Sequence, residues 1–230
     1  MMVLGIDTSG YANAVGVVDG DRVLADFTYE AKTDSLEQIV ANIDATLRSA
    51  GLTLNDVRGI GVGLGPGSWT GIRVGVTVGK ILAFSTGKPI AGVPTLEALA
   101  YSARHELLLI CAVISVGTRD AVYAAGYRSG TRVGEYYVGD VKGLTGMITG
   151  PAVLVGAGAE AYRQIVTKEM ASSQISVKAV EAIPGGAAVA CLAAQRLECG
   201  EKDDVLSLTP LYLKESTAKA FVNKYKSSHT

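Results

Sequence analysis

Short apolar runs separated by polar turns open the chain. The first three runs lie at residues 3–6, 14–18 and 22–27, with turns rich in Asp, Ser and Gly between them. Apolar runs joined by Gly and Asp turns are typical of β-hairpins. The pattern therefore predicts that the chain begins with three antiparallel strands.

The hydrophobic spacing then changes from strand-like to helical. Leu36, Ile39, Ile43 and Leu47 fall three or four residues apart, and Gly51 follows as a stop signal, which predicts a helix. The elements expected after this helix are a strand at 57–64, a helix at 70–84, a strand at 89–93 and a helix beginning at residue 95.

The second half repeats this order of elements. Strands are expected at 107–116, 121–127, 132–138 and 152–155, and helices at 159–170 and 186–197. The repeat indicates an internal duplication, visible in the order of the elements and not in residue identity. It predicts two domains of about 100 residues each. They are placed at 1–104 and 105–215, with a Lys- and Ser-rich tail at 216–230.

Composition and charge limit the classes of function. The 21 basic and 22 acidic residues give a net charge of -1, whereas proteins that bind nucleic acid unaided usually carry a basic excess. Lys214, Lys219, Lys224 and Lys226 are a local exception, which we interpret as a solvated tail. The 3 cysteines include no CxxC pair, and the run 107–116 is too short to span a membrane. These features predict a cytoplasmic protein without a membrane partner.

The loop after the first strand has two interpretations. Asp7, Thr8 and Ser9 place a carboxylate and two hydroxyls where a strand enters a tight turn. Such a loop can hold a phosphate, but Asp and Ser also favour ordinary turns. We keep Asp7, Thr8 and Ser9 as candidate nucleotide-binding residues. The corresponding loop of the second half lacks an Asp at its strand end, which weakens a two-sided nucleotide clamp.

A glycine-rich segment at 61–71 leads from a strand into a helix N-terminus, a geometry that suits anions. It matches neither the dinucleotide fingerprint nor the P-loop. Gly65, Gly67 and Ser68 are therefore candidates for a phosphate contact. The alternative is a sharp turn in which Ser68 caps the helix.

Groups that could perform catalysis are scarce. The 2 histidines, His105 and His229, have no metal-ligand spacing, and Cys111 lacks a plausible histidine base. No Gly-x-Ser-x-Gly elbow is present. The sequence thus predicts no catalytic residues and no metal site.

The helix at 70–84 carries a stripe of glycines at 71, 75 and 79. Glycine in a helix costs about 1 kcal/mol against alanine, so the stripe indicates a close backbone approach. One hypothesis is that the stripe packs on its own sheet. The other is that it meets a helix of a partner or of a second copy. Under the second hypothesis the interface comprises Leu36, Ile39, Ile43, Leu47, Gly71, Ile72, Gly75, Val76 and Gly79.

Two segments carry a resemblance to a known family. LGIDTS at 4–9 and GPGSWTGIRVG at 65–75 resemble the motifs of the TsaB family of tRNA threonylcarbamoyladenosine biosynthesis proteins. PLYLK at 210–214 is similar to a further family segment. Three residues depart from the usual pattern: Trp69 for Phe, Asp34 for His and Lys214 for Arg.

The resemblance implies a mixed-sheet α/β fold of the ASKHA (actin/Hsp70-like) type, with two duplicated RNase-H-like domains. It implies a scaffold subunit and not an enzyme. This subunit would serve the N6-threonylcarbamoylation of adenosine 37 in tRNAs that read ANN codons. The implied partners are the catalytic paralogue TsaD, the ATPase TsaE, and tRNA through the complex, while the isolated chain could pair with a second copy. No cofactor is firmly implied, and weak ATP or ADP binding is left open.

Two other classes of function remain as alternatives. One is a nucleotide-binding enzyme of the same fold, a small kinase or ATPase, which would use Asp7 and the glycines at 65 and 67. The other is an inactive homologue of a glycoprotease-like metallopeptidase, for which the sequence offers no metal ligands. ATP turnover and metal analysis distinguish these alternatives from the scaffold.

Overall fold

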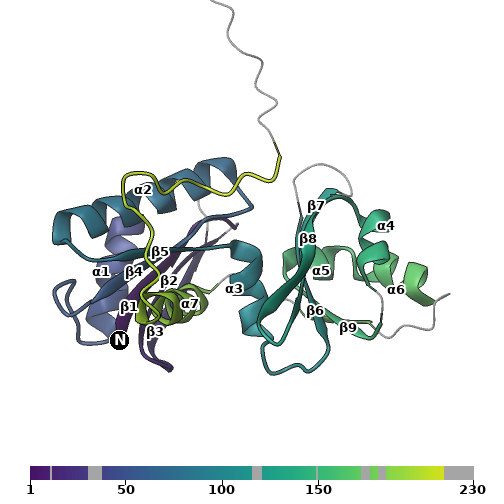
Figure 1. The fold of residues 1–230 in the computed structure, drawn as a ribbon, viewed down its shortest axis with the longest axis horizontal. Coiled ribbons are helices and arrows are strands. Elements are labelled where there is room, and N and C mark those ends of the chain that lie inside the picture. The colour runs from purple at the N-terminus through teal and green to yellow at the C-terminus, as the bar shows by residue number, and fades with distance from the viewer. Residues whose placement is uncertain are drawn as a thin grey trace, which may run out of the picture.

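A computed structural model of the chain describes residues 1–10, 12–30, 38–115, 121–148, 150–171, 177–180 and 185–214. Its two five-stranded sheets form two lobes that lie side by side (Figure 1). The first sheet has the order β3-β2-β1-β4-β5, and the second has β8-β7-β6-β9-β10. Strand for strand the two orders correspond, so the duplicated fold expected from the sequence is confirmed.

The first sheet is mixed. Its strands are β1 (Met2–Asp7), β2 (Ala12–Asp19), β3 (Arg22–Glu30), β4 (Gly59–Gly63) and β5 (Ile90–Val93). The first three pair antiparallel, as the hairpin signals predict, whereas β1, β4 and β5 run parallel. The carboxyl ends of the parallel strands therefore meet at one edge of the sheet, where ligands of open α/β sheets usually bind.

Two helices share a hydrophobic core on one face of this sheet. They are α1 (Ile39–Ser49) and α2 (Trp69–Thr86), whose buried side chains pack with Leu4 and Ile6 of β1. The Ser68 hydroxyl caps α2 by accepting a hydrogen bond from the Gly71 N–H at 3.3 Å. Gly87 ends the helix with a left-handed φ of 66°.

The second sheet consists of β6 (Leu109–Ser115), β7 (Ala121–Arg128), β8 (Thr131–Asp140), β9 (Ala152–Val155) and β10 (Val177–Val180). The helical segments of this lobe are α4 (Val141–Leu144), the 3₁₀ helix Thr145–Met147, α5 (Ala157–Ala161) and α6 (Arg163–Ala171). The helix expected at 159–170 is thus two helices, and the sequence analysis did not predict β10.

The helix α7 (Gly186–Glu198) packs on the first sheet although it lies late in the chain (Figure 1). Glycines of the strands allow this close contact: a Cβ at Gly5 or Gly16 would overlap the backbone of α7. The first lobe therefore contains a helix from the second half of the sequence. The domain boundaries at 104 and 215 stay predictions, and the tail at 216–230 lies outside the described residues.

A further helix, α3 (Thr95–Ser102), joins the lobes. Its Leu96 and Leu99 pack with Ile110 of β6 and Tyr123 of β7 in a core of the second lobe. None of the described helices combines the length and the apolar content needed to cross a bilayer.

Candidate functional site

A buried polar cluster lies at the carboxyl ends of the parallel strands. Asp7 ends β1, and its Oδ1 accepts hydrogen bonds from the Ser9 N–H at 2.8 Å and the Ser9 hydroxyl at 2.5 Å. Thr95, the first residue of α3, donates its hydroxyl to Asp7 Oδ2 at 3.2 Å. The same hydroxyl accepts from the Gly65 N–H at 3.1 Å. The cluster therefore joins β1, the glycine-rich loop and α3.

The cluster is closed to solvent. Asp7, Thr8 and Ser9 are all buried. Burial raises the pKa of the Asp7 carboxyl above its usual value, although the hydrogen bonds from Ser9 and Thr95 oppose that rise. Thr8 is also satisfied internally, because its hydroxyl donates to the Gly71 carbonyl at 2.6 Å.

The loop at 65–68 sits directly against this cluster. The Ser68 N–H donates to the Ser9 carbonyl at 2.7 Å, and a Cβ at Gly67 would overlap that same carbonyl. Gly65 has a left-handed φ of 96°, a conformation that glycine adopts without strain. The structure thus brings together all six candidate nucleotide-binding residues, Asp7, Thr8, Ser9, Gly65, Gly67 and Ser68.

The packing of these residues does not fit a phosphate group between the two loops. The polar side-chain atoms of Asp7 and Thr8 are used inside the fold, and Gly67 leaves no room beside Ser9. A nucleotide would have to separate loops that hold each other by hydrogen bonds. Weak binding of ATP or ADP to this chain stays a prediction.

The glycine stripe of α2 faces its own sheet. A Cβ at Gly71 would overlap the Thr8 carbonyl, one at Gly75 the Thr8 hydroxyl, and one at Gly79 the Val62 side chain. These contacts favour the hypothesis that the stripe packs on its own sheet, and the partner interface stays a prediction. Glycines at helical spacing indicate that another segment lies close to the helix backbone. The spacing does not identify which segment that is.

The other residues of the predicted interface are also buried inside the fold. Ile39, Ile43 and Leu47 of α1 belong to the core of the first lobe, as do Ile72 and Val76 of α2. Leu36 lies outside the described residues. The apolar sides of both helices therefore cover the sheet, and the predicted interface stays a prediction.

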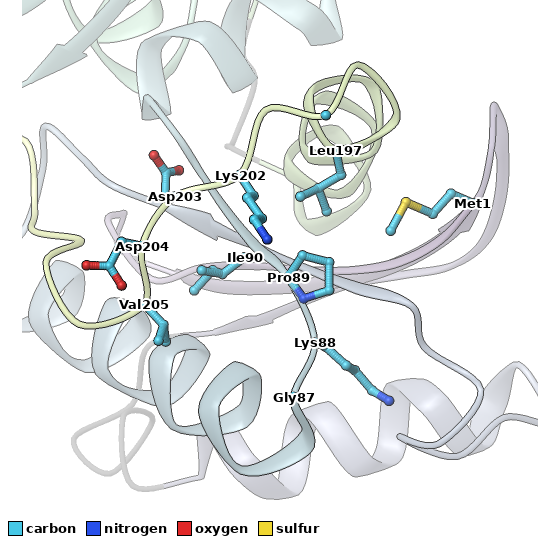
Figure 2. A pocket seen from close by; sticks show the side chains of 11 residues that line it. Met1, Gly87, Lys88, Pro89, Ile90, Leu197, Lys202, Asp203, Asp204 and Val205 are labelled. Carbon is cyan, nitrogen blue, oxygen red and sulfur yellow. The ribbon is translucent and has the colours of Figure 1, made fainter.

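The rest of the described chain offers little chemistry. No three His, Cys, Asp or Glu side chains among the described residues lie together as a set of metal ligands. A pocket of about 710 Å³ lies at the opposite end of the first sheet from Asp7. Figure 2 shows Lys202 directed toward Ile90 and Pro89 there. Asp203, which also lines the pocket, already has a partner in the fold, because its Oδ2 accepts a hydrogen bond from the Gly92 N–H at 2.7 Å.

Sequence analysis missed two features of this region. Thr95 completes the buried cluster but is 88 residues from Asp7, and no local motif connects them. Trp69 and Tyr212 stack on each other at the start of α2, with ring centroids 4.3 Å apart. The only signal of this contact in the sequence was that Trp69 and Tyr212 lie in the family-like segments 65–75 and 210–214.

Replacing Asp7 tests whether the cluster is structural. We expect Asp7→Ala to lower stability by about 1–3 kcal/mol, because the N–H and the hydroxyl of Ser9 lose their acceptor. Asp7→Asn keeps an acceptor and removes a buried charge. A raised folded-state pKa means that ionisation of Asp7 destabilises the fold as pH rises above the ordinary value of 3.8. In thermal melts, the melting temperature of the Asn variant should therefore rise relative to that of the wild type between pH 4.5 and 7.5.

The matched pair makes the result decisive. If Asp7→Asn loses as much stability as Asp7→Ala at pH 7.5, the ionised carboxylate stabilises the fold and its burial carries no net cost, contrary to this expectation.

The corresponding sheets and the joining helix define a fold of the ASKHA type. A ROK hexokinase from Thermus thermophilus has this fold, with a TM-score of 0.54 at 14% identity over 87% of this chain and 100% of that chain. The solved structure of YeaZ from Pseudomonas aeruginosa superposes with a TM-score of 0.75 at 24% identity, covering 92% of this chain and 99% of that one.

Sequence comparison identifies the family. The protein-family model "TsaD: tRNA N6-adenosine threonylcarbamoyltransferase" matches residues 24–220 of this chain. The Bacillus subtilis tRNA threonylcarbamoyladenosine biosynthesis protein TsaB is 30% identical over 228 residues, which cover 96% of this chain and 97% of that protein. The chain belongs to the TsaB family.

Proposed function

We propose that this chain acts in the biosynthesis of threonylcarbamoyladenosine in tRNA as a non-catalytic subunit. It would work in a complex with the TsaD-like transferase and a TsaE-like ATPase, so that tRNA is modified at N6 of adenosine 37 in the complex. The relationship to TsaB over almost the whole chain supports the pathway. The closed cluster around Asp7 supports the non-catalytic role, since its polar groups are used within the fold.

The observation that carries the proposed complex is the apolar outward side of α2. Ile81 is 59% exposed and Phe84 is 70% exposed, although both are large apolar side chains. Val74 and Val78 are half-buried and precede Ile81 at spacings of seven and three residues, so they continue the same side of the helix. We call Val74, Val78, Ile81 and Phe84 the α2 patch.

An exposed apolar patch of this kind marks an interaction site. The glycine stripe holds α2 close to its sheet, so the helix presents the patch from a rigid support. A partner built on the same duplicated fold can offer its equivalent helix, which gives helix-to-helix packing. A second copy of this chain can occupy the patch when the paralogue is absent.

Reconstitution tests the function directly. The purified chain is mixed with tRNA, threonine, bicarbonate, ATP and a threonylcarbamoyl-adenylate synthase, with and without the TsaD-like and TsaE-like proteins. We expect no modified adenosine from the chain alone and modification only when the partners are present. Modification without a TsaD-like protein would show that this chain is itself the transferase. Equal modification with and without this chain would remove its role as a required subunit.

A further inference from the structure

Three exposed side chains join the start of α2 to the C-terminal segment 205–214. The rings of Trp69 and Tyr212 stack with centroids 4.3 Å apart and planes 15° apart. The Arg73 guanidinium lies 4.9 Å from the Trp69 ring centroid, and its Nε donates to the Tyr212 hydroxyl at 3.1 Å. We call Trp69, Arg73 and Tyr212 the aromatic cluster.

The aromatic cluster is fixed in place yet open to solvent. Trp69 is 37% exposed and Tyr212 is 41% exposed, so both large rings leave surface uncovered. Their mutual stacking and the hydrogen bond from Arg73 restrict the side chains before any ligand arrives. A ligand therefore loses little affinity to ordering them. Within the described part of the chain, the terminal nitrogens of Arg73 have no hydrogen-bond acceptor.

The two segments that carry the aromatic cluster contain no acidic residue. No Asp or Glu occurs from residue 57 to residue 96 or from 205 to 214, although the whole chain has a net charge of -1. Arg73, Lys80 and Lys88 lie in the first stretch, and Lys214 ends the second. The Lys80 ammonium binds the carbonyls of Leu206 and Leu208 at 3.0 and 2.9 Å, which holds the two segments together. Arg73 therefore places a positive charge directly beside the exposed rings.

Exposed aromatic rings beside a guanidinium match the needs of single-stranded RNA. An unpaired base stacks on an aromatic ring, and its phosphate pairs with a nearby Arg or Lys. We propose that the aromatic cluster binds an unpaired nucleotide of RNA, with the base against the Trp69–Tyr212 rings and the phosphate at Arg73. This inference rests on the proposed function, which brings a tRNA to the complex that contains this chain.

The tryptophan makes the proposal directly measurable. Trp69 is the single tryptophan of the chain, so tryptophan fluorescence reports on the aromatic cluster alone. We expect a single-stranded ten-nucleotide adenosine RNA to quench this fluorescence to saturation at low salt. Binding should weaken as salt rises, because phosphate contacts release counterions. Saturating RNA that leaves the fluorescence unchanged would overturn the proposal.

Variants at Tyr212 separate stacking from general charge. Binding is followed by the anisotropy of labelled RNA, and circular dichroism confirms that each variant folds. Tyr212→Phe keeps the ring and should bind as the wild type does, whereas Tyr212→Ala should bind roughly tenfold more weakly. Lys88→Gln is the control. It also removes one positive charge, but Lys88 follows the C-terminal end of α2, whereas the rings lie at its start. Equal affinity for the Ala and Phe variants, both folded, would show that the rings take no part.

Two further measurements decide the occupant and keep this inference distinct from the proposed function. Tyr212→Ala should still bind the TsaD-like protein in size-exclusion chromatography, and should raise the KM for tRNA in the reconstituted reaction with kcat little changed. Loss of that protein complex instead would make the aromatic cluster a protein contact. An acidic polyglutamate peptide that quenches Trp69 as tightly as RNA would likewise overturn the RNA assignment. A wild-type chain that binds RNA but no TsaD-like protein would defeat only the proposed function.

Discussion

A Gly75→Leu variant should lose about 3 kcal/mol of stability and melt roughly 10 °C lower than the wild type. A Cβ at position 75 already overlaps the Thr8 hydroxyl, which itself donates to the Gly71 carbonyl. The rest of a leucine side chain would force α2 away from β1. The gain in helix propensity from replacing glycine is only about 1 kcal/mol, so the clash decides the sign.

Thr77→Leu is the matched control for this variant. Thr77 lies two residues away on the same helix, with its side chain exposed, so the substitution should change stability by no more than about 0.5 kcal/mol. The measurement is thermal unfolding of the isolated chain by circular dichroism. A Gly75→Leu protein that melts like the wild type, and fails only to bind a partner, would return the glycine stripe to the interface.

Much of the fold could be predicted because its signals are local. The turn at Asp19–Gly20–Asp21 fixes the β2–β3 hairpin, and the apolar spacing from Ile72 to Ala83 fixes α2. The position of α7 could not be predicted in this way, because it depends on which sheet has room for it. The strand glycines Gly5 and Gly16 are a signal that could have been used, since glycine within a strand often marks a close approach of another backbone.

The candidate site was predicted less well than the fold. The sequence placed Asp7 and Gly65 in turns but could not show that Thr95 closes the space between them. One of its two hypotheses for the glycine stripe also assigned the buried side of α2 to the interface. Strongly apolar positions are the ones that a helix buries in its own domain, so a pattern of apolar residues alone points first to the core. The exposed Ile81 and Phe84 break that pattern and are the better guide to a partner.

The α2 patch gives the last prediction. We expect Phe84→Asp to weaken binding to the TsaD-like protein roughly 100-fold, because a buried aromatic anchor at an interface contributes far more than its neighbours and a carboxylate there would be buried unpaired. The variant should fold normally, since the Phe84 side chain is exposed. Formation of modified adenosine should fall with the loss of the complex and recover at high concentration of the chain.

The control is Leu107→Asp, which introduces the same charge at a side chain that is 96% exposed and outside the patch. Isothermal titration calorimetry measures both affinities. If the two variants bind alike, the α2 patch is not the interface.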